Sequence, residues 1–230
     1  MASPRDMDDE VGEAISAFKS GRPVMIYDSD YREMETDLLW HAAAATPEVI
    51  RRLRNDCGGL LFLAIGDEIG EMFGLPWLQD IHSHKTLVEE NPVLGHLVTN
   101  DLQYDSRSAF TLSLNHRETY TGITDRDRSL TTRRFGELSE ELIVKGEDGA
   151  RAKERLGKEF RTPGHIPVCR ESPGGLKTRQ GHTELAVSIA RLAGLTACTI
   201  GAEMLEPDGD GALSVEGART YAKRHGIPMI

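Results

Sequence analysis

Four charged side chains stand close together directly after a predicted buried strand over residues 23–27: Arg32, Glu33, Glu35 and Asp37. The three carboxylates occupy five positions and repel one another unless a cation or protons compensate. A hard divalent ion such as magnesium prefers oxygen ligands and keeps several waters that a substrate can replace. The loop therefore predicts a divalent cation site, with a solvated acidic turn as the alternative.

A second candidate site is the segment Arg179-Gln-Gly-His-Thr183, which leads into a predicted helix. Free backbone amides at a helix start bind anions, and Gly181 lets a phosphate approach the backbone. Arg179 can add a bidentate pair to phosphate oxygens. Imidazole and carboxylate can ligate the same ion, so His182 is a candidate metal ligand. The alternative is an ordinary helix start with an incidental histidine.

Two further side chains could move protons. His165 follows the turn sequence Pro163-Gly164, which would place its ring at a strand entry. Glu203 lies inside the apolar run 197–205, where an inward-facing carboxylate needs a partner or a raised pKa. The alternatives are a structural histidine and the polar member of a strand alternation.

Composition excludes several classes of protein. The net charge of -10 argues against a nucleic-acid binder, whose phosphate contacts require a basic surface. No apolar run approaches the roughly 18 residues that span a bilayer, and the acidic N-terminal residues do not resemble a secretory signal. Three scattered cysteines do not suit a disulfide framework. We expect a cytoplasmic enzyme with no membrane partner.

Periodicity predicts alternating helices and strands within one domain over residues 1–230. Expected strands are 23–27, 60–65, 109–114, 166–168 and 197–205. Expected helices are 9–20, one starting at Thr46, 67–73, one ending near 142, 183–194 and 215–225. The charged segment 145–158 is expected to be a surface excursion. Short polar strands favour an α+β fold with a mixed sheet.

The order of these motifs is informative. The first motif is Arg-Glu-x-Glu-x-Asp, from Arg32, and the second is Asn-His-Arg-x-Thr-x-Thr-Gly-Ile-Thr-Asp-x-Asp-Arg, from Asn115. Pro-Gly-His from Pro163 and Arg-Gln-Gly-His-Thr-Glu from Arg179 follow. The last is the late-strand glutamate Glu203. From about residue 14 onward the chain resembles 3,4-dihydroxy-2-butanone 4-phosphate synthase, and most closely the archaeal, monofunctional form. The resemblance implies a three-layer α/β/α sandwich with a mixed, twisted central sheet.

The resemblance also implies a reaction. The family converts D-ribulose 5-phosphate into L-3,4-dihydroxy-2-butanone 4-phosphate and formate for riboflavin biosynthesis. It is a lyase that requires magnesium, with manganese as a substitute and one or two ions per site. Its members are homodimers with active sites at the subunit interface.

Motif positions assign roles to individual residues. Glu33 and His182 would ligate the metal, and His165, Glu203 and Glu35 would be catalytic. The residues expected to bind the substrate are Arg32, Glu33, Asp37, Thr124, Arg179, Gln180, Gly181, His182 and Thr183. Two positions depart from the family pattern: Tyr31 stands where relatives commonly have an acid, and Phe62 where they often have cysteine.

Two other functions fit some of these residues. One is a non-catalytic phosphate or nucleotide binder, which would not need both His165 and Glu203. The other is a different metal-dependent sugar-phosphate isomerase or aldolase. Product analysis separates the latter, because only the synthase releases formate.

Overall fold

The structure is a computed structural model that describes residues 4–98, 101–103, 105–147 and 149–230. Within these ranges six strands form one sheet in the order β1-β2-β6-β3-β5-β4. The strands are β1 (Val24–Tyr27), β2 (Thr36–His41), β3 (Phe62–Ile65), β4 (Phe110–His116), β5 (Phe160–Arg170) and β6 (Cys198–Glu203). Strands β3 and β5 are parallel and the other neighbours are antiparallel, which confirms the expected mixed sheet.

Ten α-helices accompany the sheet in the described ranges. They are α1 (Pro4–Lys19), α2 (Pro47–Asp56), α3 (Asp67–Phe73), α4 (Leu78–His82), α5 (Lys85–Glu90), α6 (Leu94–Leu97), α7 (Asp125–Lys145), α8 (Gly149–Glu159), α9 (His182–Leu192) and α10 (Val215–His225). Two short 3-10 helices cover Ala42–Ala44 and Gly175–Lys177. None of these helices is long and apolar enough to cross a membrane.

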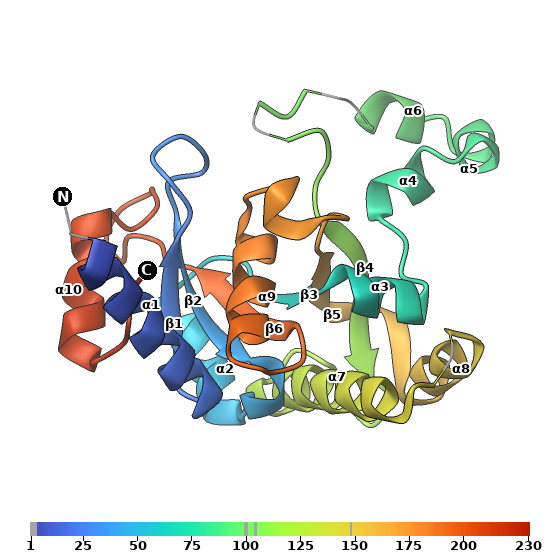
Figure 1. Cartoon of the computed structure of the whole chain (residues 1–230). Helices are drawn as coiled ribbons and strands as arrows, with labels where there is room; N and C mark the ends of the chain where they lie inside the picture. The colour runs from blue at the N-terminus through green and yellow to red at the C-terminus, as the bar shows by residue number, and fades with distance from the viewer. Residues whose placement is uncertain (1–3, 99–100, 104, 148) are drawn as a thin grey trace.

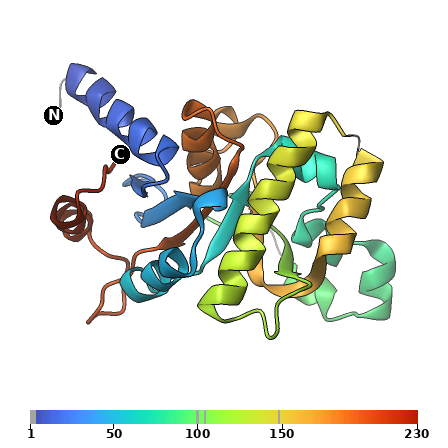
Figure 2. The ribbon, with the colours of Figure 1, turned by 90° about the horizontal axis from the view of Figure 1, so that it is seen from below.

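The alternation of side chains along β2 shows how the layers form. Successive strand residues point to opposite faces. His41 contacts Phe18 of α1 edge to face, whereas the neighbouring Trp40 lies under the guanidinium of Arg52 on α2. Helices α1 and α9 therefore cover one face, and α2 with α7 covers the other (Figures 1 and 2). The three-layer α/β/α arrangement expected from the resemblance is confirmed.

Helix ends follow the local signals in the sequence. Thr46 caps α2 by accepting a hydrogen bond from the amide of Val49, with proline at the first helical position. Thr124 caps α7 in the same way, through the amide of Asp127. Gly74 ends α3 in the left-handed conformation that glycine adopts without strain.

The edge strand β1 is covered by the last residues of the chain. The amides of Met25 and Tyr27 donate to the carbonyls of Pro228 and Ile230, and the Ile230 amide donates back to Met25. These bonds use backbone groups that an edge strand would otherwise expose. The covered edge belongs to the hairpin that carries the acidic loop between β1 and β2 (Figure 1).

Three expectations about the elements were wrong. Strand β2 was not expected, because its first residues belong to the acidic segment. The predicted surface excursion 145–158 contains helix α8, whose Ala152 is fully buried although most of its residues are charged or polar. Strand β5 is much longer than 166–168, because Pro163-Gly164 lies within the strand beside a register shift and does not end it.

Candidate active site

The acidic loop and the start of α9 meet above the sheet. His182 Nδ1 lies 2.9 Å from Glu33 Oε2, although 149 residues separate the two in the chain. Ligand atoms of Asp28, Glu33 and His182 all lie within 4.8 Å of one another. Two carboxylates and one imidazole make an oxygen-rich donor set that suits a hard divalent cation. The arrangement brings the two sequence-predicted ligands together and adds Asp28.

Asp28 holds the acidic loop in shape. Its side chain is fully buried, and its two oxygens accept hydrogen bonds from the amides of Glu33 at 2.8 Å and Glu35 at 3.1 Å. Between them, Met34 has a φ of 58°, a conformation that a non-glycine residue rarely adopts. These two hydrogen bonds offset the backbone strain at Met34. In the resulting loop conformation the Glu33 side chain contacts His182.

Asp37 and Glu203 lie opposite each other on β2 and β6, on the sheet face that α9 covers. Asp37 is fully buried, and neither of its carboxylate oxygens has a hydrogen-bond partner among the described residues. His182 approaches it, with Nε2 3.6 Å from Asp37 Oδ1. An orphaned buried carboxylate of this kind marks a position where a ligand is expected to supply the missing partner.

The environments of these carboxyl groups push their pKa values apart. Burial would raise the pKa of Glu33, but the hydrogen bond from His182 and the charge of Arg32 outweigh it and lower that pKa to about 2. Burial raises the pKa of Glu35, Asp37 and Glu203, and neighbouring carboxylates add to the effect. One group stays ionised while others can hold a proton, which is the pattern of acid/base sites.

Two arginines adjoin this cluster. Arg32 Nη1 lies 2.9 Å from Glu33 Oε2, and Arg179 Nη1 lies 2.5 Å from Glu184 Oε2. A Cβ on Gly181 would collide with the guanidiniums of both arginines. Gly181 is therefore the residue that lets two cationic side chains pack over the start of α9, as an anion site requires.

Several of these side chains line one cavity of about 300 Å³, whereas Asp28, Arg32 and Asp37 are not among its lining residues. Its wall includes six residues predicted from the sequence: Glu33, Glu35, Arg179, His182, Thr183 and Glu203. Phe62 and Cys169 supply apolar surface. Gln180 lies beside Arg32 in an adjoining pocket. A small polar molecule could contact Glu33, His182 and Arg179 in this space.

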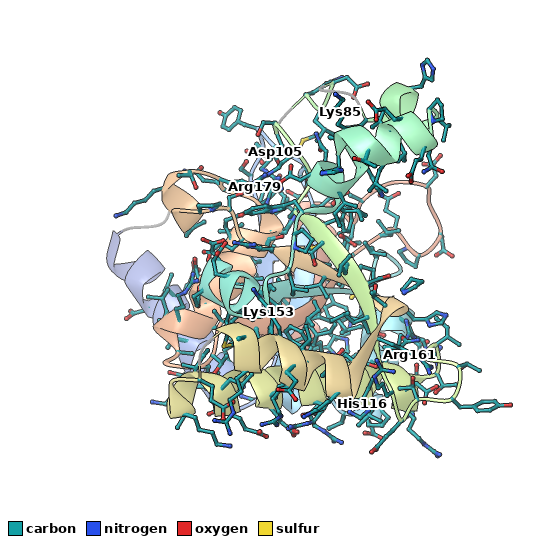
Figure 3. All side chains as sticks on the ribbon, turned by 90° about the vertical axis from the view of Figure 1, so that its right-hand side faces the viewer. Lys85, Asp105, His116, Lys153, Arg161 and Arg179 are labelled. Carbon is teal, nitrogen blue, oxygen red and sulfur yellow. The ribbon has the colours of Figure 1, made fainter. Side chains whose placement is uncertain are left out.

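His165 and Thr124 are not among the residues that line this cavity. The amide of His165 donates to Asn115 Oδ1 at 2.8 Å, and its ring Nδ1 lies 3.1 Å from Asn115 Nδ2. Figure 3 shows Asp105 and Arg179 near the top of the molecule and Arg161, at the start of β5, near the bottom. Within one chain the sequence-predicted residues therefore form two separate groups.

Comparison with known proteins identifies the family. The family model for 3,4-dihydroxy-2-butanone 4-phosphate synthase matches residues 12–230. The chain belongs to this synthase family. The resemblance inferred from the motifs is thus confirmed.

Individual relatives agree with this. The 3,4-dihydroxy-2-butanone 4-phosphate synthase of Methanosarcina mazei is 40% identical over 96% of this chain and 87% of its own length. That of Archaeoglobus fulgidus is 39% identical over 95% of this chain and 89% of its own length. A crystal structure of a synthase in complex with two magnesium ions matches with a TM-score of 0.71 and 25% identity, over 96% of this chain and 91% of that one. The similarity to archaeal forms was also expected correctly.

Three members of the site in this synthase were missed by sequence reasoning. Asp28 is the first acidic residue after β1, and this position in the acidic loop could have identified it as a candidate site residue. Glu184 directly follows the Gly-His-Thr motif; its side chain is fully buried and its Oε1 accepts from the amide of Ser172 at 2.8 Å. Asp105 had no local signal, because it acts through contacts with residues more than 70 positions away.

Proposed function

We propose that this chain converts D-ribulose 5-phosphate into L-3,4-dihydroxy-2-butanone 4-phosphate and formate. The observation that carries the proposal is the contact between Glu33 and His182 beside the paired arginines Arg32 and Arg179. It places a divalent-cation ligand set next to two guanidiniums that can bind an anion. Membership in the synthase family supports the same reaction.

We assign magnesium to Glu33 and His182, with Asp28 as a further ligand and manganese as a substitute. The donor set fits such an ion, and a relative has been crystallised with two magnesium ions. A bound divalent ion polarises substrate oxygens and stabilises an enediolate. Asp37, Glu33 and Asp28 raise the pKa of His182 despite its burial, so the protein must release a proton when His182 becomes a ligand.

The remaining residues would orient the substrate and move protons. Arg179, Gln180, Gly181 and Thr183 would hold the phosphate with a guanidinium, backbone amides and a hydroxyl. Arg32 would contact the same anion. These contacts fix the position of the sugar carbons relative to the carboxylates of the β2 and β6 strand ends.

Proton transfer would fall to Glu203 and Glu35, whose pKa values are raised by burial. Enolising a ketose requires a base close to the acidic C–H and an acid that can return the proton. Asp37, which also has a raised pKa, would donate a hydrogen bond to a substrate hydroxyl. Together these groups would serve successive proton transfers.

Formate release tests the reaction. Purified protein incubated with ribulose 5-phosphate and magnesium should release formate, and EDTA in excess should abolish the release. Phosphate binding without formate would instead favour the non-catalytic binder. A rearranged or cleaved sugar phosphate without formate would favour another isomerase or aldolase.

We also propose a homodimer whose partner supplies His165 and Thr124 to the cavity. The two groups of site residues lie apart within one chain, and large apolar side chains are exposed beside both. Tyr31 in the acidic loop is 97% exposed, and Tyr120, in the loop that leads to Thr124, is 94% exposed. Such exposure is typical of surfaces that another subunit covers.

Mixing two inactive variants tests the composite site. Glu33→Ala chains and His165→Gln chains would be unfolded together, refolded and assayed. In a random mixture of dimers, half are mixed and each has one site free of both substitutions, so about a quarter of wild-type activity should return. Each variant refolded alone is the control. No recovery in a mixture shown to form mixed dimers would place both residues in the same chain's site.

We further propose that residues 1–230 act as one synthase domain in the cytoplasm. The family match to residues 12–230 and the contiguous buried core support a single domain. The three cysteines are all free and buried, which suits a reducing compartment.

A further inference from the structure

Asp105 places a carboxylate between the two arginines of the site. Its Oδ2 accepts from Arg32 Nη2 at 2.8 Å and from Arg179 Nε and Nη2 at 3.0 and 2.7 Å. One oxygen therefore receives three N–H groups from two guanidiniums. The Asp105 side chain is 12% exposed, so solvent screens these contacts only weakly. This is the coordination that an oxygen of a bound phosphate would have.

The two guanidiniums are surrounded by more negative charge than they carry. Besides Asp105, Arg32 contacts Asp28 and Glu33, and Arg179 contacts Glu184. Four carboxylates thus face two guanidiniums and the imidazole of His182, which contacts Glu33. A phosphate dianion entering this environment would be repelled unless one carboxylate left or a metal neutralised part of the charge.

Three of the four carboxylates have partners other than the two arginines: two accept hydrogen bonds from backbone amides, and the third contacts the imidazole of His182. Asp28 accepts the amides of the acidic loop, Glu184 accepts the amide of Ser172, and Glu33 is bound to His182. The hydrogen bonds of the Asp105 carboxylate, among the described residues, go to the two arginines alone. Asp105 is therefore the anion that can be exchanged without breaking the framework of the site.

We propose that Asp105 occupies the phosphate position of the site and is a specificity-determining residue that the substrate's phosphate replaces. The proposal rests on the proposed function for the identity of the molecule that carries the phosphate. A phosphate carries up to two charges and three acceptor oxygens, so it can replace one carboxylate at both guanidiniums. An uncharged sugar cannot, because displacing Asp105 would take one anionic contact from each of two partly buried guanidiniums and give none in return.

Replacing the carboxylate by an isosteric amide tests the exchange directly. Asp105→Asn retains the shape of the side chain and removes the competing charge. Titration calorimetry with inorganic phosphate, in EDTA, should show binding about tenfold tighter than for wild type, because the competent state no longer requires displacement of the carboxylate. Asp105→Ala should also bind inorganic phosphate more tightly than wild type. Unchanged or weaker phosphate binding in both folded variants would overturn the proposal and make Asp105 an organiser of the arginines.

A matched control separates local competition from total charge. Asp208 is exposed in the turn between β6 and α10, and Asp208→Asn removes the same formal charge from the chain. It should leave phosphate affinity unchanged. Tightening equal to that of Asp105→Asn would attribute the effect to net charge and overturn the proposal.

Kinetics give a second readout. With ribulose 5-phosphate, Asp105→Asn should lower KM by a similar factor, whereas inhibition by unphosphorylated ribulose should not change. A raised KM together with weaker phosphate binding would contradict the exchange. Tighter phosphate binding in a protein that releases no formate would leave the exchange intact and reject the proposed reaction instead, so the two failures are distinguishable.

Discussion

The cavity around Glu33 and the region around His165 differ in how their polar groups are held. In the first, charges of both signs are buried together and anchored to backbone amides and to the start of α9. In the second, Asn115 contacts both the amide and the ring of His165, and the imidazole ring is exposed. The first region is preorganised by its own chain. The second presents its groups outward, which is what the proposed homodimer requires.

The largest expected effect comes from breaking the first region. Glu33→Ala should lower turnover by about a thousandfold, because loss of a metal ligand forfeits several kcal/mol of charge stabilisation. Magnesium affinity, measured by titration calorimetry, should fall with it. Glu90→Ala, an exposed glutamate at the end of α5, is the control. Normal turnover in Glu33→Ala would remove the metal assignment.

A smaller effect should separate the two regions. His165→Gln should lower kcat by about a hundredfold, which is a typical contribution of one acid or base group. Magnesium affinity should stay at the wild-type value, because His165 is not one of the proposed metal ligands Asp28, Glu33 and His182. If magnesium affinity fell as well, the two regions would act as a unit and the comparison would fail.

The smallest effect concerns the pH dependence of stability next to Asn115. Burial lowers the pKa of His116, whose Nδ1 accepts a hydrogen bond from the amide of Glu118. Below a pH of about 6.5 the imidazole of His116 takes up a proton in the unfolded chain but binds it less readily in the folded protein. The free energy of unfolding therefore falls as the pH is lowered.

In His116→Gln the loss of stability between about pH 7 and pH 5 should be smaller than in wild type, by up to about 1 kcal/mol. Urea unfolding at a series of pH values measures it. His84→Gln, an exposed histidine before α5, should keep the wild-type slope. If the free energy of unfolding of His116→Gln changed with pH as steeply as that of wild type, His116 would not be the group kept neutral in the folded protein.

Sequence reasoning succeeded where a signal is local. The boundaries of α3 and α10 were predicted correctly, and Gly74 marked the end of α3. It failed at β2, where Thr36 and Asp37 look like loop residues but are fully buried in the sheet. A strand that buries a carboxylate contradicts hydrophobic alternation, and only the surrounding fold explains it.

The site shows the same division. The contact of Glu33 with His182 joins positions that no periodicity connects, and it was anticipated only through the family resemblance. The roles assigned to individual site residues remain predictions. Asp105 could not be found in either way, because its importance arises from two arginines that meet only in the folded chain.

The pairing of the final residues with β1 has a practical consequence. Removing residues 227–230 would leave the N–H groups of Met25 and Tyr27 and the C=O of Met25 without these partners, along the outer strand of the hairpin that carries the acidic loop. Such a bare strand is a template for unrelated chains. A purification tag is therefore better attached ahead of α1. A chain shortened at this end is expected to aggregate before it loses activity.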